Sequence, residues 1–576
     1  MQTRGLWFLL LACLARLATA ETPLRIEHLV RCGDLLDHSH QRFCLSAHGL
    51  DDQPLHVRFG GQMLTAERQG QGLQFEAQPG QHSGPLLLAQ GGRFSNPVWL
   101  SLADNHVVAA RPGETAQNMD GLSTYVNLVS VIIDAQGEGL QQAQALARKY
   151  SASVVAAIPV LNTYQLRLPT RDLTERDALV LRLGSETGVA AVVIEEGAAV
   201  EQAPPAPGPA PGEDEWASNR FADALNYYRR RIPARGAPLE TVPVKVGVIE
   251  RSVDFDPPDF AEYLGACELP RTCVYARDAA QASQHGSSVV GVLAAHWQKG
   301  GNTGLLRGLD GASKGFEVIV DRDSDAGVLA NVAASVNLVE DGARVLNWSW
   351  GLNRIGAKAV QGGDVDSEVH SGLAMKGYEA LLEAFFRWLR QNHPDVVVVN
   401  SAGNGGASAD SDEYRLPSSL VTDQLLVVGG HQRGDQADMA VGAPGYAVKR
   451  ASSNIGLRVD ISAAACTHGA TDANGEAGTV HCGTSFATPM VSGTVAAMLS
   501  INPALTPEQL RILLRRSALP IGGNYDFDSV GAENLTAPIL PSERNFDLNH
   551  PDVGRSARLD IQKAFDLAVQ SRDRRR

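Results

Sequence analysis

The sequence has no surplus of basic residues, and no long hydrophobic run follows its N-terminus. Lys and Arg number 50 against 64 Asp and Glu, which gives a formal net charge of −14. Only the tail at 572–576 is locally basic. A nucleic-acid-binding function is therefore not expected, because it needs a basic patch or stripe. No later segment approaches about 18 uninterrupted apolar residues, so we expect no membrane span.

The composition also lacks the bias of disordered, collagen-like or coiled-coil chains. Hydrophobic residues make up 44% and charged residues 20% of the 576 residues. These proportions are typical of globular proteins, and the length corresponds to about three or four domains.

The first 20 residues are typical of a signal peptide. Arg4 supplies positive charge, residues 6–14 form a short apolar core, and Ala18-Thr19-Ala20 offers a small-residue cleavage site. The sequence thus predicts export to the periplasm, the cell surface or the medium. The alternative is a lipoprotein signal, in which Leu10-Leu11-Ala12 would place a lipid on Cys13.

Cysteine is scarce, with seven in the chain, and Cys13 lies in the signal peptide. The other six lie as near neighbours in three separate segments, which in an oxidising compartment favours three local disulfides. A zinc site built from His468, His481 and the two cysteines beside them is the alternative. The expected pairs are Cys32 with Cys44, Cys267 with Cys273, and Cys466 with Cys482.

The N-terminal half divides into two small regions and a linker. Residues 21–115 contain short alternating strands, such as LHVRF and VWLSL, and predict a small β-sandwich that resembles immunoglobulin-like modules. Residues 120–200 follow the order strand, helix, strand, strand, helix, strand, which is the ferredoxin-like α+β plan. Residues 201–215, EQAPPAPGPAPGEDE, are rich in proline and predict a semi-rigid solvated linker.

Residues 216–576 alternate between apolar runs and helical patterns. VKVGVIE, RVLNWSW and DVVVVNSAG are almost continuously hydrophobic, as strands buried on both faces should be. Helical patterns at 288–297, 378–391 and 485–500 separate them. The region is therefore predicted to be α/β, with a doubly wound, mostly parallel sheet.

Three polar residues stand at the starts of helices or the ends of strands. Ser485, in GTSFATP, directly precedes a long apolar helical run, where free backbone N–H groups and the helix dipole favour a negative oxygen. His285, in HGSSVVG, opens another helix, and Asn404, in SAGN, follows a buried strand. Alone, each would be a cap, a structural histidine or a turn residue. Structural roles do not explain all three together in this order.

These motifs resemble the subtilisin-like serine proteases. GTSFATPMVSG, HGSSVVG and SAGN stand in the family's order, and the resemblance covers about residues 216–576. It implies a subtilisin-like fold and a serine endopeptidase that hydrolyses protein or peptide substrates through an acyl-enzyme. The region at 120–200 is similar to the family's propeptides, which help the protease fold and then block its cleft. The resemblance therefore implies a zymogen inhibited by its own prodomain and cut near 196–216.

The resemblance also assigns roles to residues of this chain. Ser485 matches the nucleophile, and His285 matches the general base that later protonates the leaving amine. Asn404 and the backbone N–H of Ser485 match the donors to the oxyanion. Ser349-Trp350-Gly351 matches the segment whose backbone lines the substrate cleft.

One position departs from the family's pattern. Where the family has Val-Ile-Asp followed by a small residue and glycine, this chain has Val248-Ile249-Glu250-Arg251-Ser252. A carboxylate is needed there to hold the histidine tautomer, and Glu250 is the expected third member. Asp254 and Asp256 are the alternatives. A second hypothesis follows from this departure: a catalytically weak or inactive protein of the same fold that acts as a binding module.

The predicted chemistry requires no cofactor and no catalytic metal. Residues 321–327 resemble the start of a calcium loop with the glycine one place late, so structural calcium is a weak alternative to a solvated turn. Asn347 and Asn534 begin glycosylation triplets, and the first lies in a predicted buried strand.

Overall fold

The structure is a computed structural model. It describes residues 22–37, 41–69, 72–134, 138–197, 216–232, 240–277, 284–296, 303–321, 327–358, 369–410, 415–435, 438–471, 478–522, 534–544, 549–550 and 552–573. The predicted signal peptide and the linker at 201–215 lie outside the described residues.

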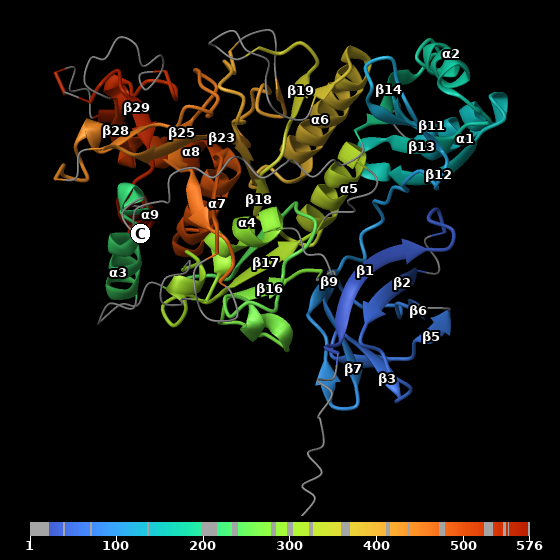
Figure 1. Cartoon of the computed structure of the whole chain (residues 1–576), viewed down its shortest axis with the longest axis horizontal. Helices are drawn as coiled ribbons and strands as arrows, with labels where there is room; N and C mark the ends of the chain where they lie inside the picture. The colour runs from blue at the N-terminus through green and yellow to red at the C-terminus, as the bar shows by residue number, and fades with distance from the viewer. Residues whose placement is uncertain are drawn as a thin grey trace, which may run out of the picture.

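The N-terminal region folds as two antiparallel sheets that share one apolar core (Figure 1, blue). Strand side chains alternate between core and solvent, so that Val57 and Phe59 are buried while His56 and Arg58 are exposed. A disulfide joins Cys32 to Cys44 across neighbouring strands. One sheet holds β1 (Arg25–Cys32), β2 (Arg42–His48), β6 (Gly72–Glu76) and β5 (Glu67–Gln69); the other holds β4 (Gln62–Leu64), β3 (Leu55–Phe59), β7 (Gly84–Gln90), β8 (Arg93–Phe94) and β9 (Val98–Leu100).

The second region is an antiparallel sheet with two helices (Figure 1, cyan). β14 packs against α5 (Gly327–Glu340) and α6 (Gly372–Asn392), so one apolar cluster runs from this sheet into the next region. The region comprises β10 (Thr115–Gln117), β11 (Ser123–Ile133), α1 (Gly139–Lys149), β12 (Ser153–Ile158), β13 (Thr163–Arg167), α2 (Leu173–Leu183) and β14 (Val189–Glu196).

The C-terminal region is built on a ten-stranded, mostly parallel sheet, which confirms the predicted α/β class. The order is β16-β17-β15-β18-β21-β23-β25-β29-β28, with β24 paired to β23. The strands are β15 (Val244–Val248), β16 (Cys273–Tyr275), β17 (Phe316–Val320), β18 (Val345–Trp348), β21 (Val397–Ser401), β23 (Leu425–Arg433), β24 (Ala447–Lys449), β25 (Ile461–Ala464), β28 (Leu519–Ile521) and β29 (Ser556–Arg558). A separate three-stranded sheet consists of β20 (Val369–His370), β19 (Leu352–Arg354) and β22 (Arg415–Leu416). Along the chain, its strands lie between those of the ten-stranded sheet.

Helices cover both faces of this sheet because its strands are apolar on both. Along β23, Leu426 and Val428 face one core cluster, and Leu425 and Val427 face the other. The first cluster contains α3 (Phe221–Arg231), α4 (Gln284–Ala294), α7 (Thr484–Ile501), α8 (Pro507–Ser517) and α9 (Ile561–Asp573); the second contains α5 and α6.

Among the described residues, the helix α7 is long and apolar enough to cross a membrane. All of its residues are buried inside the protein, where it packs against β18, β21 and β23. It is a core helix of this fold, and its first turn carries the candidate nucleophile.

Candidate active site

Ser485 is the second residue of α7, immediately after the turn at Gly483. The residue is 8% exposed, and its Oγ donates to the carbonyl oxygen of Ser349 at 3.2 Å. In return, Ser349 Oγ donates to the carbonyl oxygen of Ser485 at 2.8 Å. The start of α7 is thereby held against the segment that follows β18.

Glu250 and His285 meet at the carboxyl end of β15. Glu250 follows that strand by two residues, and His285 is the second residue of α4. His285 Nδ1 lies 3.1 Å from both Oε1 and Oε2 of Glu250. The Glu250 side chain is 6% exposed and that of His285 36%, so the carboxylate is shielded while the imidazole reaches solvent. This is the arrangement of a buried carboxylate orienting a reactive imidazole.

A glycine permits this meeting. A Cβ on Gly286 would lie 2.5 Å from the carbonyl oxygen of Ser252, so any larger residue would push α4 away from the strand end. In the histidine motif, close packing therefore requires Gly286, whereas His285 is the candidate for the chemical role.

The other side of His285 faces the start of α7. Its ring centroid lies 5.3 Å from that of Phe486, the residue after Ser485. The His481 ring also lies near Phe486, with centroids 6.2 Å apart. Burial lowers the pKa of His481, and the nearby His285 lowers it further. His285 therefore sits between the Glu250 carboxylate and the candidate nucleophile's helix.

The two alternative carboxylates do not occupy the position of Glu250. The backbone N–H of Asp254 donates to Ser287 Oγ at 2.9 Å, and burial raises the pKa of the Asp254 carboxyl. Asp256 is exposed and forms an ion pair with Arg25 of β1. Among these three acids, Glu250 is the one that contacts His285 in the described part of the chain.

Asn404 lies over the turn that carries Ser485. Its Oδ1 accepts hydrogen bonds from Thr484 N at 2.8 Å and from Thr484 Oγ1 at 3.1 Å. A Cβ on Gly483 would lie 3.1 Å from Asn404 Nδ2, so the amide nitrogen faces this turn. Because Oδ1 accepts from two donors, the orientation of the amide is fixed, with Nδ2 toward Gly483, two residues before Ser485.

The sequence interpretation misses Thr484 as a positioning residue. Its hydroxyl donates to Asn404 Oδ1 and accepts from Gly403 N at 3.2 Å. Gly403 has a φ of +105°, a conformation that needs glycine. A threonine before the nucleophile carries no local signal for this role, since its partners are about 80 residues away in sequence.

The segment predicted to bind substrate follows β18 directly. Asn400 Nδ2 donates to the carbonyls of Trp348 and Trp350, both at 2.8 Å, which ties this segment to β21. The Trp350 ring packs on Trp348, with centroids 5.1 Å apart. Ser349 contacts Ser485, whereas Gly351 lies against the guanidinium of Arg415, a residue that the sequence interpretation does not single out.

The predicted metal alternatives find no support in the described residues. Cys466 and Cys482 form a disulfide and are therefore not free as metal ligands. Cys267 and Cys273 also form a disulfide. Within the described ranges no group of three or more His, Cys, Asp or Glu could hold a metal. Of the calcium-like stretch, 322–326 lies outside the described residues.

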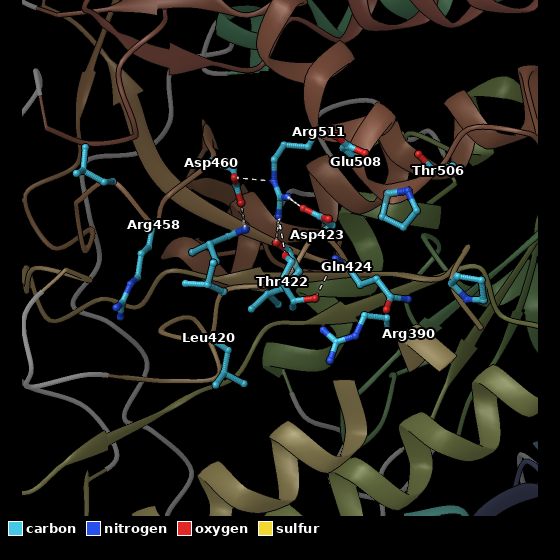
Figure 2. A pocket seen from close by; sticks show the side chains of 16 residues that line it. Arg390, Leu420, Thr422, Asp423, Gln424, Arg458, Asp460, Thr506, Glu508 and Arg511 are labelled. Carbon is cyan, nitrogen blue, oxygen red and sulfur yellow. Dashed lines mark hydrogen bonds and ion pairs between the residues drawn. The ribbon is translucent and has the colours of Figure 1, made fainter. Parts of the chain in front are cut away.

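A separate cavity of about 660 Å³ lies near the amino ends of strands of the ten-stranded sheet (Figure 2). Residues near the beginnings of β23 and β25 line this cavity, whereas Glu250, Ser349 and Asn404 follow the carboxyl ends of strands. Its Arg511 is held by Asp460 at 3.0 Å and Asp423 at 3.3 Å. Burial raises the pKa of Asp460, and Arg511 opposes that rise. Ligands of open α/β sheets bind at the carboxyl ends of strands, so this cavity is not the candidate active site.

Comparison with known proteins identifies a family for most of the C-terminal region. Residues 243–550 match the model of the subtilase family. The chain is 26% identical over 287 residues to a probable subtilase-type serine protease of Deinococcus radiodurans, covering 48% of this chain and only 34% of that protein. It is 28% identical over 284 residues to subtilisin of Bacillus pumilus, covering 49% of this chain and 86% of that one. The solved structure of fervidolysin from Fervidobacterium pennivorans, a keratinolytic enzyme related to subtilisin, is 16% identical, with a TM-score of 0.46 over 80% of this chain and 64% of that one.

Proposed function

This chain belongs to the subtilase family, and on that basis we propose that it is an exported serine endopeptidase in which Glu250 replaces the family's aspartate. Membership supports serine-type peptidase chemistry in general. The particular residues, the export and the zymogen form are our proposals, and each has its own supporting observation.

The contact between Glu250 and His285 carries the proposal. A carboxylate at this position keeps the proton on Nδ1 and stabilises the imidazolium that forms during catalysis. Both oxygens of Glu250 lie 3.1 Å from Nδ1, so the longer side chain reaches the imidazole. Burial of the carboxylate strengthens the interaction by removing competing water.

The reaction proceeds in two halves. Ser485 Oγ turns from the carbonyl of Ser349 toward His285, gives its proton to Nε2 and attacks the peptide carbonyl carbon. His285 then passes that proton to the leaving amine as the C–N bond breaks. Water repeats the sequence on the acyl-enzyme and releases the acid. In the absence of substrate the Ser–His contact is often loose, so the 3.2 Å bond from Ser485 to Ser349 does not oppose this path.

The negative oxygen of each tetrahedral intermediate is stabilised by two donors. We assign this role to Asn404 Nδ2, which faces the turn at Gly483, and to the backbone N–H of Ser485 in the first turn of α7. Loss of one such donor typically lowers kcat by about 10²–10³-fold. The positive end of the α7 dipole acts in the same direction.

The region at 120–200 is proposed to be an inhibitory prodomain, and two glutamates support this. Glu195 Oε1 and Oε2 accept from the backbone N–H groups of Leu329 at 2.9 Å and Val328 at 3.1 Å, at the start of α5. Glu196 accepts from Ser371 N at 2.8 Å and Ser371 Oγ at 2.7 Å, at the start of α6. The last two residues of β14 thus cap two helices of the protease region and join the two regions at this point.

Export rests on the N-terminal pattern and agrees with the disulfides. Three disulfides, Cys32–Cys44, Cys267–Cys273 and Cys466–Cys482, join the predicted partners. Disulfides persist in oxidising compartments. We therefore propose that the chain acts outside the cytoplasm.

Labelling with a fluorophosphonate probe tests the function. Wild-type protein should label on Ser485, Ser485→Ala should not label, and Glu250→Ala should label much more slowly. Self-cutting in 198–215 should appear in the wild type and be absent from Ser485→Ala. Wild-type protein that is not cut and does not label, and that still fails to label after removal of residues 1–215, would instead indicate the binding-module hypothesis.

A further inference from the structure

The N-terminal sheets, formed by β1 to β9, contact one edge of the ten-stranded sheet. β16 lies at that edge, and the residue that follows it, Ala276, is fully buried. Asn96 Nδ2 donates to the carbonyl oxygen of Ala276 at 2.9 Å, and the N–H of Ala276 donates to the carbonyl oxygen of Pro97 at 3.0 Å. Both backbone polar groups of Ala276 are therefore bound by the segment between β8 and β9.

Asn96 is itself held by the N-terminal sheets. The residue is fully buried, and its Oδ1 accepts from the backbone N–H of Ile26 in β1 at 2.8 Å. Because Oδ1 is the acceptor in this bond, the amide is oriented with Nδ2 toward Ala276. The two ends of one amide thus join β1 to the end of β16.

The end of β16 also holds the loop that carries Glu250. The carbonyl oxygen of Arg277, one residue farther along, accepts from the backbone N–H of Val253 at 3.0 Å. Val253 is fully buried and lies three residues after Glu250. The position of the loop therefore depends on where the chain leaving β16 is fixed.

Two further contacts fix the same loop. The N–H of Asp254 donates to Ser287 Oγ at 2.9 Å, in the first turns of α4, the helix that carries His285. Asp256 forms an ion pair with Arg25 at the start of β1, and the Arg25 side chain is 8% exposed. The loop thus lies between α4 on one side and residues bound to the N-terminal sheets on the other.

We propose that Asn96 is a positioning residue for the Glu250–His285 pair and that the N-terminal sheets thereby support the active site. The proposal rests on the serine-peptidase function proposed above and deepens it. Asn96 fixes Ala276, and the next residue fixes Val253. Any shift of Val253 is carried over three residues to Glu250. Because a displacement of about 1 Å at a catalytic group can cost about 10²-fold in rate, this support is needed for full activity.

Steady-state kinetics of Asn96→Asp in the full chain test the proposal. The variant keeps an acceptor for the N–H of Ile26 but places a carboxylate oxygen against the carbonyl oxygen of Ala276. With active enzyme counted by fluorophosphonate titration, we expect kcat to fall by at least about tenfold. KM should stay within about twofold, because the segment predicted to bind substrate follows a different strand, β18. A kcat within about twofold of the wild type would overturn the proposal.

Gln90→Glu is the matched control. Gln90 is 1% exposed, and its Nε2 donates to the carbonyl oxygens of Asp51 at 3.1 Å and Gln53 at 2.9 Å, inside the N-terminal region. The same change from amide to carboxylate should destabilise the N-terminal sheets there but leave kcat within about twofold. Equal losses of kcat in Gln90→Glu and Asn96→Asp would show that Asn96 matters only for folding.

A double variant shows whether Asn96 acts through Glu250. Glu250→Asp already withdraws the carboxylate from His285, since its side chain is one methylene shorter. Adding Asn96→Asp to Glu250→Asp should therefore slow probe labelling by less than about threefold, compared with at least about tenfold when Glu250 is present. Equal losses in the two backgrounds would overturn the proposal.

Hydrogen exchange makes the test independent of catalysis. In Ser485→Ala protein, the N–H of Val253 should exchange at least about tenfold faster after Asn96→Asp but not after Gln90→Glu. Equal exchange rates in these two variants would overturn the proposal. Wild-type protein that does not label with the probe, while the exchange rates differ as expected, would overturn the catalytic function alone.

Arg25→Gln keeps the proposal testable if Asn96→Asp does not fold. Arg25 pairs with Asp256 in the loop, whereas Arg93 pairs with Asp51 inside the N-terminal region. Arg25→Gln should therefore speed exchange at Val253 by at least about threefold, and Arg93→Gln should not. Equal rates in these two variants would show that the N-terminal sheets do not hold the loop.

Discussion

The residue that distinguishes this site is Glu250, whose carboxylate is one methylene farther from the backbone than that of an aspartate. Both of its oxygens lie 3.1 Å from His285 Nδ1. An aspartate on the same backbone would end about 1.5 Å short. We therefore expect the site to be adapted to glutamate.

Glu250→Asp is expected to lower kcat/KM by at least about tenfold, and Glu250→Ala by about 10⁴-fold, because each loses the contact that fixes the imidazole. Steady-state kinetics on one peptide would measure both. Asp254→Asn is the matched control, since Asp254 contacts Ser287 through its backbone, and it should retain activity within about twofold. An aspartate variant as active as the wild type would contradict this account.

His431 should make stability fall at acid pH. Its imidazole is fully buried between Ser218 Oγ, 2.8 Å from Nε2, and Ser462 Oγ, 3.1 Å from Nδ1. Burial lowers the pKa of His431 well below its usual range, and Arg558 lowers it further. The unfolded chain therefore binds a proton below about pH 6.5 that the folded chain does not bind.

The free energy of unfolding should thus decrease by up to about 1.4 kcal/mol per pH unit as the pH falls below about 6.5. Thermal unfolding of Ser485→Ala protein between pH 7 and pH 5 would measure this slope. Adding His431→Gln should flatten it, whereas His28→Gln, at an exposed strand position, should not change it. Equal slopes with and without His431 would exclude this histidine as the cause.

At the scale of elements, a hairpin leads directly into the nucleophile turn. β26 (Cys466–His468) pairs with β27 (Val480–Cys482), and the disulfided cysteines lie directly opposite each other. The next residue, Gly483, donates its N–H to Ala465 O at 2.8 Å. The hairpin therefore sets where α7 begins.

Replacing Cys466 and Cys482 by serine should lower stability by up to about 3 kcal/mol, the value typical for a loop of this length, and should slow labelling of Ser485. Probe labelling and thermal unfolding with and without reductant would show both effects. Replacing Cys32 and Cys44 is the control and should leave the labelling rate unchanged. Free thiols at Cys466 and Cys482 in unreduced peptides would refute the premise.

The helix caps supplied by β14 give a second prediction at this scale. The double variant Glu195→Ala, Glu196→Ala removes the carboxylates that accept from N–H groups at the starts of α5 and α6. We expect each loss to weaken docking of the proposed prodomain by about 0.5–2 kcal/mol.

The measurement uses Ser485→Ala protein cut at an engineered site within 201–215, with retention of the N-terminal fragment followed by size exclusion on dilution. Glu186→Ala is the control, because Glu186 pairs with Lys149 inside the same region. Equal retention of all variants would show that the caps do not hold the prodomain.

At the scale of the whole molecule, the N-terminal region at 21–115 contacts both other regions. Trp99 Nε1 donates to Asp341 Oδ2 at 2.8 Å, and Lys245 Nζ lies 4.9 Å from the Trp99 ring. Ala276 N donates to Pro97 O at 3.0 Å, at the edge of the ten-stranded sheet. The chain continues from there to His106, whose N–H donates to Ala157 O in the second region at 2.8 Å.

These contacts predict that a cut within 201–215 does not by itself release the N-terminal half. In the cut Ser485→Ala protein, both parts should elute together. Trp99→Ala should weaken retention by at least about tenfold, because it removes a partly buried aromatic ring and leaves the Asp341 carboxylate without its indole donor. Met63→Ala, on the same sheets but exposed, should not weaken it. Immediate separation of the wild-type parts would contradict the prediction.

The sequence alone determines what depends on periodicity and local chemistry. Buried strands such as β15, β18 and β21 have apolar residues on both faces, so their α/β class follows from the pattern of hydrophobic residues. The disulfide partners follow from nearness along the chain. The motifs around Ser485, His285 and Asn404 identify the family because they are short and local.

Tertiary structure decides what depends on residues far apart in sequence. Glu250, rather than Asp254 or Asp256, contacts His285. Which of these acids reaches the imidazole depends on the path of the chain after β15, and that path cannot be read from the sequence. The placement of Arg415 between Gly351 and Gly403, and of Thr484 under Asn404, arises only when separate strand ends meet at one edge of the sheet. Local patterns specify the elements, whereas the positions of side chains at the candidate site depend on contacts formed only after those elements pack.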